Sequence, residues 1–598
     1  MFVTLANLPP AQPVLFVELR FVWIFTIIFL VNWALRWNTA RKVWLLICSH
    51  VFYTTFFVGD PIEFVGNLAH GRWNLLHEGW WFPLLLWFST VMDYFVGIGI
   101  EAAKTDRGRR LWVATSLTIN LGVLGFFKYY GFFDENVRAV FSWFGLSPTW
   151  EPLKVFLPWG ISFYTFQSLS YSIEVYRKHL PAERSFLNLA LFIAFFPQVI
   201  AGPIVRAMTF LPQTLKKTEW SKVDVRGCLV MFFMGFIKKA CISDNLAGVA
   251  DSFYGAPQDY NSFSAWMAIL AYTGQVYCDF SGYSDMAIAV SRLLGYDLCQ
   301  NFSFPYFSAS ITDFWRRWHM SLSSWLRDYV YISFGGNRGG KIFTYRNLMI
   351  TMILGGLWHG ASWAFVLWGT MQGAGLILHR EWTQRASAQA LAVMKWFAVP
   401  ITFLFFALTL VPFRSGDTYL GAMGRSPAGE NILLPLPADG SAPLRDGKPA
   451  EVLALHSTGG GFLAEGRDSE DAVPMSGLRR NVLTGNYHLS PPNGSSAPDV
   501  VAAQPMVARR LTASWGTMST VLGGLVGLSH GGRSVCSNLM LIVLAILTIV
   551  HFLNYKKVLS TWWRRIPQWS FAFLLGVGFA LAVFMKPVVF KAFIYFQF

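Results

Sequence analysis

A single histidine lies within an apolar, aromatic stretch that is long enough to be immersed in lipid. This stretch, ILGGLWHGASWAFVLWG (353–369), carries one ionisable side chain, His359. Ionisable groups at membrane depth are energetically expensive, so each is a candidate for function. An imidazole can take up a proton near neutral pH, which suits a general base that activates a hydroxyl for acyl transfer. The structural alternative is a histidine that forms a hydrogen bond to a neighbouring helix.

Small and aromatic residues flank this histidine. On a helix, Gly355 and Gly356 lie one turn before His359, and Trp363 lies one turn after it. The two glycines remove side-chain bulk, so another backbone or a substrate can approach closely. We favour clearance for a substrate, and we expect the space beside the imidazole to be lined by Gly355, Gly356, Trp358 and Trp363.

A second histidine lies in an aromatic and basic segment closer to the N-terminus. Ser310 is followed three residues later by Asp313, a spacing that resembles a capping box and predicts the start of a helix. On that helix, Trp315, His319 and Ser323 would form one stripe. His319 is therefore a candidate partner for the first histidine.

Three arginines in the same segment suggest an anion partner. Arg316, Arg317 and Arg327 would lie elsewhere on the helix, and a guanidinium is well suited to the phosphates of a nucleotide-bearing donor. The alternative is an interfacial amphipathic helix whose arginines reach lipid headgroups. The glycine-rich turn FGGNRGG (334–340) matches neither a P-loop nor a dinucleotide fingerprint.

Two carboxylates interrupt another apolar run. Asp279 and Asp285 lie in GQVYCDFSGYSDMAIAVSRLLGY (274–296). Buried carboxylates require partners, and Arg316, Arg317 and Arg327 are candidates. We favour structural pairing over a catalytic role for both aspartates, and retain them as candidate donor-binding or cavity-lining residues.

The elements that must position these groups are membrane helices. The chain is 54% hydrophobic and 14% charged, whereas soluble domains carry about 25% charged residues. An all-α polytopic membrane protein follows. Candidate spans are 16–35, 43–59, 80–100, 111–128, 155–175, 187–205, 228–250, 263–294 (bent or divided), 347–378, 392–412, 537–555 and 569–590. The run 187–205 contains Pro197 and Pro203, so we expect it to enter the membrane, return and line a cavity.

The formal charge of +15 is concentrated in short loops, which indicates membrane topology rather than nucleic-acid binding. The basic loops 36–42, 104–110, 177–184, 215–226, 379–385 and 556–565 are predicted to be cytoplasmic, which places the N-terminus on the periplasmic side. The six cysteines have no metal-ligand spacing, so we expect no metal site.

The chain divides into three parts. Residues 1–413 form a transmembrane core, and residues 537–598 supply C-terminal helices that complete it. Between them, residues 414–536 are rich in Gly, Pro, Ser and Ala. Loop alternation makes this segment an extracytoplasmic insertion, loosely folded and with a small β-rich element.

Long, ordered stretches of the chain resemble the membrane-bound O-acyltransferase (MBOAT) superfamily, and within it the bacterial branch of alginate O-acetylase membrane subunits. The stretches are FFKYYGFF (126–133), LPWGISFYTFQSLSYSIEVYR (157–177), FPQVIAGPIVR (196–206), GFIKKACISDNLA (235–247), DFSGYSDMAIAVSRLLGYDLCQNFSFPY (279–306), DFWRRWHMSLSSWLRDYVYISFGGNRGG (313–340), GGLWHGASWAFVLWG (355–369) and FIYFQF (593–598). The resemblance covers residues 80–415 and resumes near 537.

The resemblance implies a ring of tilted transmembrane helices around a central tunnel in a bacterial inner membrane. His359 matches the catalytic histidine of the superfamily, and His319 matches its second active-site position. The donor would be acetyl-CoA from the cytoplasm, with no tightly bound cofactor. The acceptor would be a hydroxyl of an extracytoplasmic polysaccharide such as an alginate-like exopolysaccharide, reached with a periplasmic acetyltransferase partner. The chain departs from the family at 425–515, where a shorter loop is usual.

Several alternatives remain at this point. His359 could act as a general base or form a covalent acyl intermediate. The group transferred could be D-alanyl or fatty acyl, passed to a cell-wall polymer, lipid or protein, and an acetyl group could go to cellulose or peptidoglycan. A transporter should show paired broken helices in two halves, whereas this chain concentrates its unusual residues in 274–369.

Overall fold

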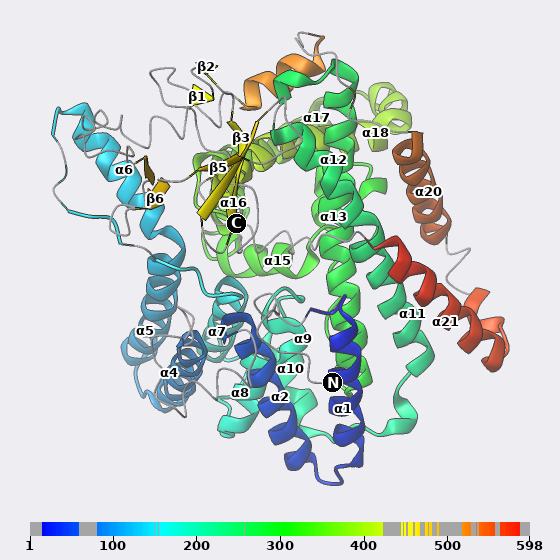
Figure 1. Ribbon diagram of the computed structural model, residues 1–598. Coiled ribbons are helices and arrows are strands. Elements are labelled where there is room, and N and C mark those ends of the chain that lie inside the picture. The colour runs from blue at the N-terminus through cyan, green and yellow to red at the C-terminus, as the bar shows by residue number, and fades with distance from the viewer. Residues whose placement is uncertain are drawn as a thin grey trace.

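The computed structural model describes residues 15–58, 81–422 except 147, 149, 154 and 256, 517–527, 534, 538–556 and 562–586, together with the backbone of short strands between 444 and 489. The described core is helical (Figure 1). Its helices are α1 (Leu19–Ala34), α2 (Asn38–Val58), α4 (Phe82–Ala102), α5 (Asp106–Leu124), η3 (Gly125–Tyr129), α6 (Tyr130–Trp143), α7 (Ile161–Tyr176), α8 (Phe186–Ala194), α9 (Phe196–Val199), α10 (Ala207–Leu215), η4 (Trp220–Lys222), α11 (Val225–Phe236), η5 (Ile237–Ser243), α12 (Asp244–Gly255), η6 (Pro257–Asp259), α13 (Ser262–Leu293), η7 (Pro305–Phe307), α14 (Ile311–Trp315), α15 (Met320–Trp325), η8 (Leu326–Tyr331), α16 (Gly340–His359), α17 (Trp363–Arg385), α18 (Ala388–Ala422), α20 (Asn538–Tyr555), η9 (Trp562–Arg565) and α21 (Gln568–Met585).

Short strands lie within the segment that the sequence assigns to an insertion. They are β1 (Leu444–Arg445), β2 (Lys448–Pro449), β3 (Val452–Thr458), β4 (Gly461–Gly466), β5 (Val473–Met475), β6 (Leu478–Arg480) and β7 (Tyr487–Leu489). Pairing is antiparallel in the order β1-β2, β3-β4-β5 and β6-β7, and Thr458 lies opposite Gly461 at the β3-β4 hairpin. Most of 414–536 otherwise lies outside the described residues.

Four of the described helical stretches are long and apolar enough to cross a membrane: Phe82–Ala102, Asp106–Trp143, Ala388–Ser415 and Gln568–Met585. The outer surface of such helices is apolar as well. Trp23 on α1, Phe95 on α4 and Phe573 on α21 are each more than half exposed. Exposure of such large apolar side chains is unfavourable in water but favourable in contact with lipid. These features confirm a helical membrane protein.

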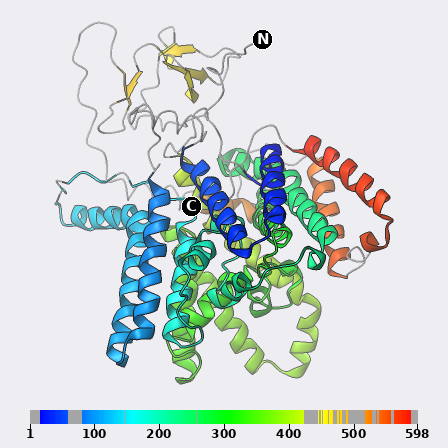
Figure 2. The ribbon, with the colours of Figure 1, turned by 90° about the horizontal axis from the view of Figure 1, so that it is seen from below.

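Both ribbon views place α4 and α5 toward one edge of the helical body and α20 and α21 at the opposite edge (Figures 1 and 2), and most side chains of α13 are buried. The predicted division of 263–294 is wrong, because α13 is one continuous helix of 32 residues. Its internal Gly282 supports close packing rather than a break. A Cβ at that position would lie 2.6 Å from the carbonyl oxygen of Gly235 on α11, so the two helices meet backbone to backbone.

The predicted single span at 347–378 is also wrong, because it is two helices. α16 ends at His359 and α17 begins at Trp363, and Gly360 between them is fully extended. The two helices pack against each other. This break places His359 at a helix end instead of in the middle of a span.

The segment 187–205 is broken and buried in protein. Its helix α8 stops at Ala194, α9 contributes one turn, and all residues from 188 to 205 are buried. Side chains of other segments satisfy its backbone, since Phe196 N donates to Ser49 Oγ (3.0 Å) and Ile204 N donates to Ser321 Oγ (3.0 Å). Irregular backbone at membrane depth is tolerated only under such conditions.

Charged side chains of the predicted basic loops bind neighbouring segments. The contacts are Arg109 Nη2 to Tyr176 O (2.6 Å), Lys217 Nζ to Arg36 O (2.6 Å), Arg226 Nη2 to Ile566 O (2.7 Å) and Lys341 Nζ to Glu381 Oε1 (2.6 Å). They join 104–110 to the end of α7, 215–226 to 36–42 and to the segment after η9, and 379–385 to the start of α16. Among the predicted basic loops, 215–226 therefore lies beside 36–42, and 104–110 lies beside the residue that precedes 177–184.

Three π-helical segments interrupt the helices, and each carries charged side chains. Lys128 lies in η3, Lys238 and Lys239 lie in η5, and Asp328 lies in η8. A π-bulge adds one residue to a turn and redirects the side chains around it, and such bulges are frequent at functional sites. These segments bring ionic groups into an apolar assembly.

Candidate active site

His359 is the last residue of α16 and is 3% exposed. Aromatic rings surround its imidazole. The ring centroids of Trp358, Trp368 and Phe413 lie 5.0, 5.1 and 5.3 Å from its own, all in edge-on orientation. Because the helix ends here, the imidazole lies where the chain turns into α17 and not on a helix face.

His319 is fully buried and has a left-handed backbone, with φ +42°. Ser310 does cap a helix as predicted, since Asp313 N donates to its Oγ (3.1 Å). That helix, α14, ends after five residues, however, and α15 begins only after His319. The predicted stripe of Trp315, His319 and Ser323 on one helix is therefore wrong.

A buried asparagine is the reason for this break. The backbone oxygen of Asn301 accepts from Met320 N (2.9 Å), and its Oδ1 lies 3.1 Å from Nδ1 of His319 and accepts from Ser321 Oγ (2.9 Å). Its Nδ2 donates to Ser284 Oγ on α13 (3.2 Å). Because Oδ1 can only accept, it selects the tautomer of His319 with the proton on Nδ1 and the lone pair on Nε2.

In the structure both histidine rings contact the indole of Trp358. The ring of Trp358 lies 5.6 Å from that of His319 and 5.0 Å from that of His359. Phe163 and Phe166 on α7 cover the same indole, with centroids 5.5 and 5.9 Å away. Two ionisable rings, separated by forty positions in the sequence, thus share one buried aromatic cage.

A half-buried lysine holds the end of the helix that carries His359. Lys128 Nζ donates to the backbone oxygen of His359 (3.3 Å) and to that of Trp358, and Tyr129 OH donates to Leu357 O (2.8 Å). The last carbonyls of a helix have no partner within the helix, and a cation near them is favourable. Our sequence analysis missed Lys128, although an ionisable residue beside an apolar span was the signal that could have identified it.

We predict that Lys128→Met lowers kcat by about tenfold or more while leaving KM for the acyl donor unchanged, because small displacements of a catalytic group cost rate rather than binding. Lys128→Arg should recover most of the loss, since a guanidinium can donate to the same carbonyls. Steady-state kinetics of purified protein in nanodiscs tests this, with the exposed Lys104→Met as control. Wild-type kcat in Lys128→Met would exclude the positioning role.

Backbone atoms of α17 fill the space beside Gly356, so the prediction of substrate clearance there is wrong. A Cβ at Gly356 would lie 2.2 Å from Phe365 O and 3.2 Å from Gly369 Cα, both on α17. A Cβ at Gly355 would meet Leu326 Cδ1 at 3.2 Å. Gly356 allows α16 and α17 to pack closely, whereas Gly355 faces Leu326 of η8, and a leucine at 356 would separate α16 from α17 rather than block a substrate.

The other aromatic candidates lie at different depths. Trp315 reaches the site indirectly, because its ring is 5.9 Å from that of Trp368, which contacts His359. Trp363 is 49% exposed, and its Nε1 donates to Asn136 Oδ1 (2.9 Å). The structure therefore does not place Trp363 beside the imidazole.

Two of the candidate arginines lie apart from the histidines. Arg316 is exposed, and Arg317 forms an ion pair with Asp313 one turn earlier (2.9 Å). Ser323 is half-buried and donates to Trp318 O (3.1 Å). These groups stabilise the local turn and are not gathered around the aromatic cage.

Lysines, not arginines, pair with the buried aspartates, which corrects the predicted partners. Lys239 Nζ lies 2.6 Å from Asp279 and 2.7 Å from Asp244, and all three side chains are less than 5% exposed. Lys238 Nζ lies 2.5 Å from Asp285. These ion pairs join η5 and α12 to α13, consistent with structural pairing.

Within the part of the chain that the structure describes, no group of three or more His, Cys, Asp or Glu side chains could hold a metal ion. Cys48, Cys228, Cys241 and Cys278 are buried thiols and Cys299 is half-buried. Cys536 lies outside the described residues.

The chain matches a family model and several curated proteins. The model of the membrane-bound O-acyltransferase family (MBOAT) matches residues 132–410, which include both histidines. The chain is 41% identical over 399 residues to the probable alginate O-acetylase AlgI of Pseudomonas aeruginosa, covering 66% of this chain and 71% of that protein. It is 35% identical over 401 residues to the peptidoglycan O-acetyltransferase of Helicobacter pylori, covering 62% and 71%.

A more distant similarity extends to the teichoic acid D-alanyltransferase of Streptococcus thermophilus, at 29% identity over 243 residues that cover 38% of this chain and 57% of that protein. The buried histidine pair and the apolar helical exterior fit a membrane enzyme of the family that these matches identify. The chain belongs to the membrane-bound O-acyltransferase family and is an O-acyltransferase.

Proposed function

We propose that this enzyme transfers an acetyl group from acetyl-CoA to a hydroxyl on the extracytoplasmic side of a bacterial inner membrane, for O-acetylation of an alginate-like exopolysaccharide. The observation that carries the proposal is the pair of buried imidazoles on Trp358, enclosed by aromatic rings. A site of low polarity that holds two proton-accepting rings suits the activation of a hydroxyl toward a thioester.

His359 acts as the general base. Its imidazole takes the proton of the acceptor hydroxyl while the hydroxyl oxygen bonds to the thioester carbonyl carbon. The carbon–sulfur bond then breaks, and the departing thiolate of CoA takes the proton from the imidazolium. The acceptor is the polysaccharide itself or a hydroxyl of a periplasmic acetyltransferase partner that completes the transfer.

His319 orients the reacting groups. With its proton on Nδ1 toward Asn301 (3.1 Å), Nε2 carries a lone pair and cannot donate to a carbonyl oxygen. Polarisation of the thioester by this tautomer is therefore disfavoured. The lone pair suits an accepted hydrogen bond from a second donor on the acceptor, such as a neighbouring hydroxyl, which would hold the acceptor while the reacting hydroxyl gives its own proton to His359.

The helices form a ring around a tunnel that is open to both sides, with the N-terminus and the 414–536 insertion in the periplasm. The hydrogen bonds between the basic loops 215–226 and 36–42 support a common cytoplasmic face for these two loops, because positive loops are retained there. Acetyl-CoA enters from that face, and the insertion lies toward the acceptor.

The similarity to an alginate O-acetylase at 41% identity favours a polysaccharide acceptor. A second acceptor, peptidoglycan, is supported by the 35% identity to a peptidoglycan O-acetyltransferase. Mass spectrometry of exopolysaccharide and cell wall from the host, with and without this gene, separates them. Loss of O-acetyl esters from exopolysaccharide alone is the expected result, whereas loss of D-alanyl esters, or unchanged polymers, would refute the proposal.

A further inference from the structure

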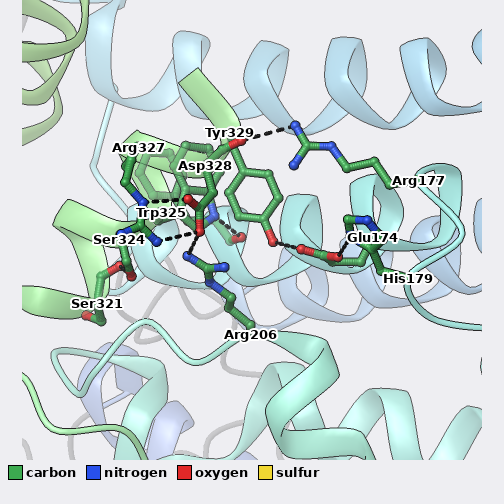
Figure 3. A network of polar contacts seen from close by, with 11 residues as sticks. Glu174, Arg177, His179, Arg206, Ser321, Ser324, Trp325, Arg327, Asp328 and Tyr329 are labelled. Atoms are coloured by element: carbon green, nitrogen blue, oxygen red, sulfur yellow. Dashed lines mark hydrogen bonds and ion pairs between the residues drawn. The ribbon is translucent and has the colours of Figure 1, made fainter. Parts of the chain in front are cut away.

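Three arginines from distant segments converge on one carboxylate and one phenol (Figure 3). Arg206 Nη2 lies 2.6 Å from Asp328 Oδ2, and Arg327 Nε donates to Asp328 Oδ1 (2.7 Å). Arg177 Nη2 donates to the backbone oxygen of Asp328 (3.1 Å). Tyr329 lies between Arg177 and Arg206, whose guanidinium carbons are 5.2 and 5.4 Å from its ring centroid.

The group carries more positive than negative charge. Asp328 faces two guanidinium groups, and the only other carboxylate drawn in the network, Glu174, accepts from Tyr329 OH and lies 2.8 Å from His179. Three arginines thus face two carboxylates. The side chains are 21%, 63% and 19% exposed for Arg206, Arg327 and Asp328, so a ligand from solution can reach them.

The arginine group is connected to the histidine site through one aromatic pair. Trp325, in the helix before Asp328, stacks on Phe166 at 3.9 Å and donates its Nε1 to Phe166 O (3.0 Å). Phe166 in turn covers Trp358. The same helix begins directly after His319, so the two sites share α15 and its neighbours.

Arg177 also belongs to the predicted cytoplasmic side. It directly follows α7, whose last residue Tyr176 accepts from Arg109 of the 104–110 loop (2.6 Å). The same Nη2 of Arg177 also donates to Ser333 Oγ (3.1 Å), directly before the FGGNRGG turn. Gly335 and Gly336 in that turn have positive φ, so the turn depends on glycine to lie beside the arginines.

We propose that Arg177, Arg206 and Arg327 bind the phosphate groups of the acyl donor. The inference rests on the proposed function for the identity of the donor. Guanidinium groups bind phosphate oxygens in a bidentate manner, and several around one anion give strong charge-assisted hydrogen bonds. A bound phosphate would replace part of the contact with Asp328 and would compensate the excess positive charge. The phosphates would be held here while the thioester extends toward Trp358.

The experiment compares two donors on the purified full-length enzyme in zwitterionic nanodiscs. Acetyl-CoA carries phosphates, and S-acetylpantetheine carries the same thioester without them. Arg327→Gln should lower kcat/KM for acetyl-CoA by about tenfold or more, the scale of one charge-assisted hydrogen bond, and leave kcat/KM for S-acetylpantetheine unchanged. Arg177→Gln should behave in the same way. The exposed Arg110→Gln, in the 104–110 loop, is the control and should affect neither donor.

Each other outcome has a defined meaning. Equal losses for both donors in Arg327→Gln would show a structural role and overturn the site. If Arg327→Gln leaves the kinetics unchanged but weakens the interaction of the enzyme with anionic phosphatidylglycerol, the arginines bind lipid headgroups, and the donor-phosphate site is overturned as well. If the wild-type enzyme uses neither donor and does not bind CoA by calorimetry, the proposed function fails, whereas CoA binding that Arg327→Gln leaves intact refutes only the arginine site.

Discussion

His359→Ala is expected to abolish O-acetylation, with a loss of at least about a thousandfold, near the upper end of the range for a general base or nucleophile. The imidazole is buried among Trp358, Trp368 and Phe413, whose rings cannot accept a proton in its place, and alanine supplies no basic group. The measurement is ester-bound acetate on purified polymer, normalised to enzyme in the membrane fraction. His379→Ala, further along α17, is the control and should retain wild-type activity.

Near-normal acetylation in His359→Ala would remove the residue from the mechanism. His319→Asn provides the comparison, because asparagine tolerates the left-handed backbone of that position better than most residues. If His319 orients the acceptor, its loss should lower activity by a smaller factor than that of His359 and leave a measurable remainder. Equal losses in the two variants would instead show that the two imidazoles act as one unit.

Lys239→Met is expected to cause the largest loss of stability. Lys239 lies between Asp244 and Asp279, and its removal leaves two buried carboxylates without their common cation. Breaking a buried ion pair in this way costs about 3–5 kcal/mol. The thermal midpoint and the yield of monodisperse protein in detergent should both fall, whereas the exposed Lys216→Met should change neither.

The same three residues offer a test of why Lys239→Met loses stability. Replacing buried ionic groups together by neutral ones is often tolerated, so adding Asp244→Asn and Asp279→Asn to Lys239→Met should restore much of the lost midpoint. A triple variant that is as unstable as Lys239→Met would show that the lysine acts through packing of η5 against α13 and not through charge.

Local patterns predicted a good part of the molecule. The apolar runs predicted helices at α1 and α2 and helices long and apolar enough to cross a membrane at α4 and α18, since lipid thickness imposes a long apolar segment wherever a helix crosses. Ser310 predicted a helix start because capping involves neighbours three residues apart. The prolines in 187–205 predicted a broken segment, and the rarity of ionisable groups in such runs selected His359.

Contacts between distant residues decided the rest. The sequence near His319 does not indicate that Asn301 breaks its helix. Local sequence likewise does not indicate that Lys239, and not an arginine, pairs with Asp279, or that Lys128 holds the helix end at His359. Each of these contacts joins two elements, and local propensity and periodicity carry no information about which elements meet. Sequence alone thus determined that the chain crosses the membrane and which histidines could do chemistry. Tertiary structure decided their shared indole and tautomer and the charges around them, because buried polar groups must find partners wherever packing brings one within reach.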